Sequence, residues 1–177
     1  MTEQLRDRWY ALYVRSNFER TVEHCLKGKG YQAFSPFYQT WRKRTDRTKK
    51  LDLPLFPSYV FCNFNANERL PIVTTPGVVT IVGGGNIPEP IELSEIHSLQ
   101  LVAESGRPVY PWPFLNPGQR IRIEAGPLAG SEGTLVKVKD EFRLVVSITL
   151  LQRSMAVVVD QDMVRPLFEK LSLAEVA

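Results

Sequence analysis

The chain has little cysteine, little histidine and no paired carboxylates at a catalytic spacing. Cys25 and Cys62 are the only cysteines among 177 residues. Each lies in an apolar pattern, which favours two free buried thiols over a disulfide. His24 and His97 are the only histidines, so the Cys/His spacings that hold a metal ion or form a catalytic set are missing. We therefore expect no enzyme activity, no metal and no cofactor.

Long apolar runs are also missing. None approaches the roughly 20 residues of a membrane helix, and the polar start Met1–Asp7 lacks the apolar core of a secretory signal. The hydrophobic share of 44% and the charged share of 23% are typical of a soluble globular protein. We expect a cytoplasmic monomer with no membrane partner.

Net charge is only +3, but it is unevenly distributed. The segment Arg42–Lys50 carries +5, which leaves −2 for all other residues. Such a run is often a solvated loop, yet the repulsion between its closely spaced cations favours a nucleic-acid phosphate partner. The cations of this basic segment are Arg42, Lys43, Arg44, Arg47, Lys49 and Lys50.

The aromatic stretch Leu55–Phe64 is the most informative part of the sequence. Its alternation after Pro57 predicts a strand, which places on one face Tyr59, Phe61 and Asn63, and on the other Val60, Cys62 and Phe64. A domain of this size needs only one such face for its core. The other face is a candidate apolar surface for a partner.

A proline-rich window divides the chain. It predicts a semi-rigid linker at 106–117 between domains at 8–105 and 118–171. The first domain has patterns in the order β-α-β-β-α-β-α, which indicate a ferredoxin-like α/β sandwich. The second is rich in β-branched residues and predicts five short strands in a small SH3-like β-barrel, an α+β fold in all. Its nearly balanced charges favour a protein partner for the barrel.

Local signals add detail to the first domain. A capping box of Ser16 and Glu19 predicts the start of a helix that ends near Gly28. Further segments follow in the order of the chain: extended pieces at 31–34 and 37–41, the basic loop, a short helix at 67–73, a strand at 78–82 and a last helix capped by Ser94.

Three motifs in this order resemble the NusG family of transcription elongation factors. Trp9-Tyr10 opens the first strand, and Leu55–Phe61 is similar to the family's Phe-Pro-Gly/Asn-Tyr signature with Ser58 at the variable position. Gly118–Gly133 resembles the KOW motif. The motif residues matched are Gly118, Ile121, Ile123, Gly126, Pro127, Gly130 and Gly133.

The resemblance implies that the N-terminal (NGN) domain binds the clamp helices of RNA polymerase through an apolar groove beside upstream DNA. It assigns to this groove Tyr13, Phe56, Tyr59 and Phe61. Aromatic side chains suit such a role because they offer large contact area at a small rotamer cost. That these residues fill the core instead remains open. Holding the clamp closed would suppress pausing and termination.

Two features resemble a specialised paralogue of the RfaH or polysaccharide-operon (UpxY) type. Arg20 and His24 lie one helical turn apart, with Arg15 before them; this patch resembles one that contacts the non-template strand. After Val146-Ser147-Ile148 the chain departs from the housekeeping pattern, so Rho binding is not expected. A ribosomal protein is left open as a KOW partner, with Ile148 and Leu150 as contacts. The β-branched content argues against refolding into a helical hairpin.

Two alternatives remain. The chain could be a general NusG-type factor that acts without a recruitment sequence. It could also be an RNA-binding KOW protein of the ribosomal type, whose basic segment holds structured RNA.

Overall fold

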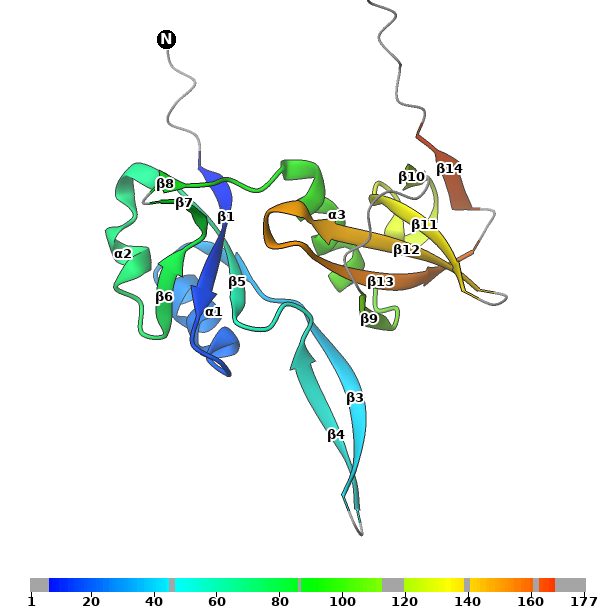
Figure 1. Cartoon of the computed structure of the whole chain (residues 1–177), viewed down its shortest axis with the longest axis horizontal. Coiled ribbons are helices and arrows are strands. Elements are labelled where there is room, and N and C mark those ends of the chain that lie inside the picture. Colours follow the sequence, from blue (N-terminus) through cyan, green and yellow to red (C-terminus); the bar gives the residue numbers. More distant parts are fainter. Residues whose placement is uncertain are drawn as a thin grey trace, which may run out of the picture.

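The computed structural model describes residues 7–44, 47–85, 87–112, 120–138, 141–160 and 163–167. Two larger β-sheets lie on either side of helix α3 (Leu93–Glu104), and a long hairpin projects away from both (Figure 1). The fold is mixed α/β with few helices and many strands. None of the helices in these ranges is long and apolar enough to cross a membrane.

The first sheet is built around the aromatic stretch. It has the order β2-β5-β1-β6, and β1 pairs antiparallel with β5 from Arg8↔Phe64 to Tyr13↔Tyr59. The strands predicted at Trp9-Tyr10, at 31–34, after Pro57 and at 78–82 are confirmed. Their bounds are β1 (Arg8–Val14), β2 (Gln32–Phe34), β5 (Tyr59–Phe64) and β6 (Val78–Ile81).

Helices α1 (Glu19–Gly28) and α2 (Leu70–Val73) cover one face of this sheet, with a 3-10 turn at Ala66–Glu68 before α2. Val22 and Leu26 of α1 and Ile72 of α2 are fully buried against it. The sheet residues beneath them come from alternate positions of β1 and β5: Tyr10, Leu12, Val14, Val60, Cys62 and Phe64. The predicted division of β5 into two faces is therefore confirmed.

The predicted capping box is wrong. The residue before the first turn of α1 is Phe18, and no side chain caps it. The Glu19 carboxylate instead accepts a hydrogen bond from the backbone N–H of Ser58, 2.8 Å away. A turn distant in sequence thus takes the acceptor that a local cap would have used. The cap of α3 is likewise not Ser94, because the residue before that helix is Glu92.

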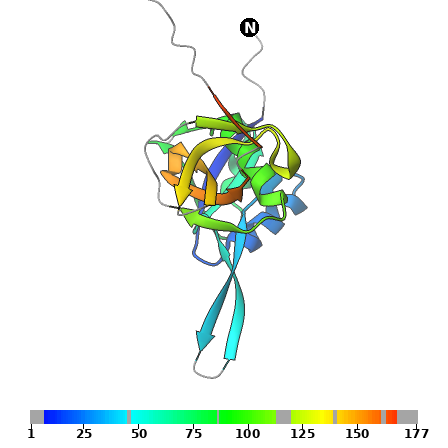
Figure 2. The same cartoon turned by 90° about the vertical axis from the view of Figure 1, so that its right-hand side faces the viewer.

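The predicted basic loop is a β-hairpin. Strands β3 (Phe37–Arg44) and β4 (Arg47–Pro54) pair without interruption from Phe37↔Pro54 to Arg44↔Arg47. Both views show this hairpin extending beyond the body of the molecule (Figures 1 and 2). A second, minor hairpin consists of β7 (Gly83–Gly84) and β8 (Ile87–Pro88).

The second sheet is antiparallel, with the order β14-β10-β11-β12-β13-β9. Val109–Trp112, within the predicted linker, forms β9 and pairs with β13. The remaining strands are β10 (Arg120–Ile123), β11 (Glu132–Val138), β12 (Glu141–Ile148), β13 (Arg153–Val159) and β14 (Val164–Pro166). The predicted strand content of this half is confirmed. Closure into a barrel stays a prediction, because the described ladders include no pairing between β9 and β14.

One hydrophobic cluster joins the two sheets through α3. It contains Phe56 and Phe61 from the first unit, Ile96 and Leu99 from α3, and Val146 with its neighbours from the second sheet. The predicted domain boundaries at 105 and 118 stay a prediction. The cores on either side of them are continuous in this arrangement.

Candidate functional site

The face of the first sheet that is turned away from α1 and α2 carries a cluster of aromatic residues. Register places Trp9, Ala11 and Tyr13 of β1 beside Asn63, Phe61 and Tyr59 of β5. Four pairs of rings on this face have centroids 5.2–5.7 Å apart, at distances typical of stabilising aromatic pairs. We call this surface the aromatic face; its members are Trp9, Tyr13, Phe34, Phe56, Tyr59 and Phe61.

The four predicted groove residues belong to this face but differ in exposure. Phe56 and Phe61 are buried at 1% and 0%, Tyr59 is half-buried, and Tyr13 is 42% exposed. Helix α3 and the second sheet cover the buried pair. The structure thus brings the predicted residues together, but two of them are buried in a cluster that the chain's own α3 and second sheet share.

Specific polar contacts join the second sheet to α3 and to the aromatic face. Thr149 Oγ1 donates to a Glu95 carboxylate oxygen 2.6 Å away, and the Glu132 backbone N–H donates to Ser98 Oγ at 2.8 Å. The Arg153 guanidinium lies 5.5 Å from the centre of the Tyr59 ring, a cation–π geometry. Thr149 is exposed and Glu95 is half-buried, so water competes with their bonds. These three contacts are therefore specific, and none of them is a buried ion pair.

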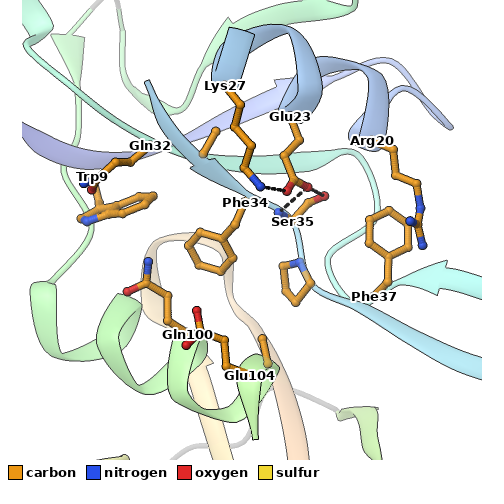
Figure 3. Close-up of a pocket in the computed structure, with 13 residues that line it drawn as sticks. Trp9, Arg20, Glu23, Lys27, Gln32, Phe34, Ser35, Phe37, Gln100 and Glu104 are labelled. Carbon is orange, nitrogen blue, oxygen red and sulfur yellow. Dashed lines mark hydrogen bonds and ion pairs between the residues drawn. The ribbon is translucent and has the colours of Figure 1, made fainter. Parts of the chain in front are cut away.

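The cover over the aromatic face is incomplete at its β2 edge. A cavity of about 680 Å³ opens there between α1, β2 and the end of α3, with Trp9 and Phe34 facing Gln100 and Glu104 (Figure 3). Its polar wall is internally paired: Glu23 accepts hydrogen bonds from Lys27 Nζ at 2.7 Å and from Ser35 Oγ at 2.9 Å. Part of the aromatic face therefore already meets solvent.

The turn before β5 is fixed by long-range contacts. Ser58 has a positive φ of 66°, a conformation that non-glycine residues rarely adopt. Its N–H donates to Glu19, which is only 4% exposed, and its carbonyl accepts from Val14 N–H at 2.9 Å. These bonds set the position from which Tyr59 enters the aromatic face.

The β3–β4 hairpin concentrates positive charge away from the body. The ladder pairs Arg42 with Lys49 and position 44 with 47, so like charges lie directly opposite each other. Such pairs destabilise a free hairpin. The exposed cations Arg42, Lys49 and Lys50 are therefore well placed to receive a polyanion.

The three residues of the patch predicted at α1, Arg15, Arg20 and His24, differ in their contacts. Arg20 is held at the base of the hairpin, where it forms an ion pair of 3.2 Å with Asp52 and lies 4.1 Å from the Phe37 ring centroid. Arg15 and His24 are exposed to solvent. The predicted patch thus keeps two free members, while Arg20 ties α1 to the hairpin.

The KOW-motif residues build a turn that packs on α3. Ile121 and Ile123 are buried, and Gly126 and Gly130 take positive φ values of 77° and 90° around the exposed Pro127. Gly133 lies so close to the Val145 carbonyl that a Cβ atom would collide with it. Gly118 lies outside the described residues.

The proposed KOW partner contacts face the interior of the docked molecule. Ile148 is fully buried, and Leu150 is half-buried against the shared cluster. Both surfaces suggested for partners, the aromatic face and the Ile148 region, therefore lie at the same internal interface.

The sequence did not predict the roles of three residues that the structure brings to these sites. Glu19 and Arg153 act across separations of 39 residues or more, which leave no local pattern. Trp41 is 67% exposed on the hairpin, and the signal for it was available: an aromatic residue beside a run of cations.

Comparisons with known proteins agree with this architecture. Residues 7–100 match the model of a family described as transcription termination factor NusG. The transcription termination/antitermination protein NusG of Pseudomonas aeruginosa is 28% identical over 161 residues, covering 83% of this chain and 91% of that protein. The corresponding protein of Escherichia coli K12 is 26% identical over 177 residues, covering 90% and 96%.

A solved structure described as domain interaction in Thermotoga maritima NusG covers 92% of this chain and 98% of its own. Its TM-score is 0.52 and its identity 21%, a likeness that shows a shared fold. The matched family model, which spans more than half of the chain, identifies a transcription factor. The chain belongs to the NusG family.

Proposed function

We propose that this protein binds the clamp helices of RNA polymerase through the aromatic face and suppresses pausing or termination. The single observation that supports this best is the amount of aromatic surface on one side of a sheet whose other side already has its helices. A face whose cover depends in part on solvent-exposed polar contacts, such as that between Glu95 and Thr149, suits an exchangeable partner. The protein acts in the cytoplasm, where the polymerase is.

Polymerase binding requires the second sheet to leave the aromatic face. Phe56 and Phe61 are inaccessible while α3 and the second sheet cover them, so a partner helix and the second sheet compete for one surface. The affinity for polymerase is then reduced by the fraction of molecules that are closed. Release of the second sheet also exposes Ile148 and Leu150, the proposed contacts for a ribosomal protein.

Nucleic acid provides the second contact. Exposed Arg15 near α1, together with the hairpin cations, can neutralise phosphates of upstream or non-template DNA, and exposed His24 can stack on an unpaired base. This contact is proposed to direct the protein to selected operons. After Ile148 the chain has Thr149-Leu150 in place of the housekeeping pattern, and Thr149 forms a hydrogen bond with Glu95. This difference supports a specialised family member that does not bind Rho.

The test is binding to a purified bacterial elongation complex. Because truncating the buried Phe56 would damage the core, the variant is Tyr13→Ala/Tyr59→Ala, at the accessible edge of the aromatic face. Tyr110→Ala is the control, since Tyr110 has the same 42% exposure as Tyr13 but lies on β9. We expect at least tenfold weaker binding for the double variant alone. Equal binding by all three proteins, or binding only to folded RNA, would contradict the proposal.

A further inference from the structure

We propose that the β3–β4 hairpin binds single-stranded nucleic acid by stacking an unpaired base on the indole ring of Trp41. This inference rests on and deepens the nucleic-acid contact proposed above, because it names the form of nucleic acid and the residue that selects it. Trp41 is 67% exposed and has no ring partner among the described residues.

The surroundings of Trp41 are cationic. The ladder places Lys50 directly opposite it, so both side chains lie on the same face of the hairpin, while Arg42 and Lys49 form the next pair on the opposite face. A large apolar ring flanked by exposed ammonium and guanidinium groups matches a nucleotide, which has an apolar base face and a phosphate. A purely apolar partner would leave these cations unpaired.

The position of Trp41 favours a single strand over a duplex. The faces of paired bases are stacked inside a duplex, and a side chain reaches them only as a wedge at a leading edge. Trp41 lies instead on the flank, three positions before the last pair Arg44↔Arg47. Those three positions span about 10 Å of strand, about the length of three stacked nucleotides. A short single strand can therefore lie along the hairpin.

Other exposed apolar residues do not extend this surface. Leu53 is 38% exposed, but it pairs with Tyr38, which places it on the opposite face near the base of the hairpin. One isolated indole among polar neighbours offers too little apolar area for a protein groove. Base stacking needs only one ring.

The experiment measures fluorescence anisotropy of labelled dT12, rU12 and a 12-base-pair duplex with the full-length protein at two salt concentrations. Trp41→Ala should weaken binding of the single strands by about 5- to 150-fold, the range for loss of one stacked base. Trp41→Phe should retain most of the affinity, because a phenyl ring still stacks. The matched control is Ile87→Ala, which removes an apolar side chain 76% exposed on the β7–β8 hairpin.

Charge and stacking should separate in the same assay. Arg42→Gln/Lys49→Gln should lower the salt slope by about 0.7 for each lost phosphate contact, whereas Trp41→Ala should leave the slope unchanged. Unaltered dT12 and rU12 binding by Trp41→Ala, or duplex binding as tight as that of the single strands, would overturn the inference. A protein that binds dT12 or rU12 through Trp41 and never binds polymerase would support it while contradicting the proposed function.

Discussion

The thiol of Cys62 is a probe of the core, because its pKa depends on its burial. Burial raises the pKa of Cys62 from 9.0 to about 12, because an ionised sulfur would lose its hydration between β5 and the helices. Both cysteines are free, as the sequence predicted. Cys62 is fully buried and Cys25 only partly so.

Stability should therefore fall in alkali. The native state keeps the Cys62 thiol protonated while the unfolded chain ionises it, so the contribution is intact below pH 9 and is lost as pH rises towards 12. We expect the difference in free energy of unfolding between wild type and Cys62→Ala to shrink by up to about 1.4 kcal/mol per pH unit above pH 9. Urea titrations at pH 8, 9 and 10 measure it. A constant difference would contradict this origin; Cys25→Ala is the control.

The Glu19 carboxylate should contribute more to the free energy of unfolding than a carboxylate in the first turn of a helix usually does. Glu19→Ala removes the acceptor for the Ser58 N–H and should cost about 1–3 kcal/mol, the usual penalty of an unpaired part-buried donor. Glu19→Gln should cost less, since its amide oxygen can still accept. Chemical denaturation of the two variants decides. Equal stability of wild type and Glu19→Ala would show that the turn does not depend on this bond.

At the scale of elements, pattern reasoning succeeded where burial alternates. Strand β10 and helix α1 have one buried side each, and the sequence shows it. In β1 and β5 the pattern separates the two faces correctly, although both faces are buried. The extended segment predicted at 37–41 is confirmed as part of β3, with Tyr38 packed against the core. The rest of the β3–β4 hairpin was predicted as a loop, because its residues are mostly polar and show no alternation. The position of α3 was not predicted for another reason. Its contact with both sheets depends on tertiary packing, which a helical sequence pattern does not encode.

Glycine at position 133 tests the packing of the second sheet. A Cβ atom there would collide with the Val145 backbone carbonyl and lie 2.9 Å from Leu144 Cδ1. Gly133→Ala should therefore destabilise the protein by about 1–3 kcal/mol. Gly28→Ala, at the end of α1 with open space around it, should cause no loss. Thermal unfolding of both variants measures the contrast; a Gly133→Ala protein as stable as wild type would contradict the close approach.

For the whole molecule, the sequence predicted two units and four of the six residues on the aromatic face, namely Tyr13, Phe56, Tyr59 and Phe61. It did not predict that Phe56 and Phe61 would be buried, because their cover comes from residues about 40 to 100 positions away. A strand pattern shows which face a residue occupies. It does not show whether a partner or the same chain covers that face.

Weakening the docked arrangement should strengthen polymerase binding. Glu95→Ala removes the hydrogen bonds to Thr149 and shifts molecules towards the open form, with a gain in affinity of up to about tenfold. Glu68→Ala, an exposed carboxylate far from this interface in the sequence, is the control. Affinity for an elongation complex is the measurement. Weaker binding by Glu95→Ala would mean that docking assists recognition.

The most direct test of the central claim, that polymerase replaces the second sheet on the aromatic face, is hydrogen–deuterium exchange of the free and polymerase-bound protein. Two amides should exchange faster in the complex: that of Glu132, which is bonded to Ser98, and that of Thr149, which is bonded to Glu95. Residues 55–64 should stay protected. Unchanged protection of both amides in a fully bound complex would contradict the displacement, and polymerase would then have to bind elsewhere.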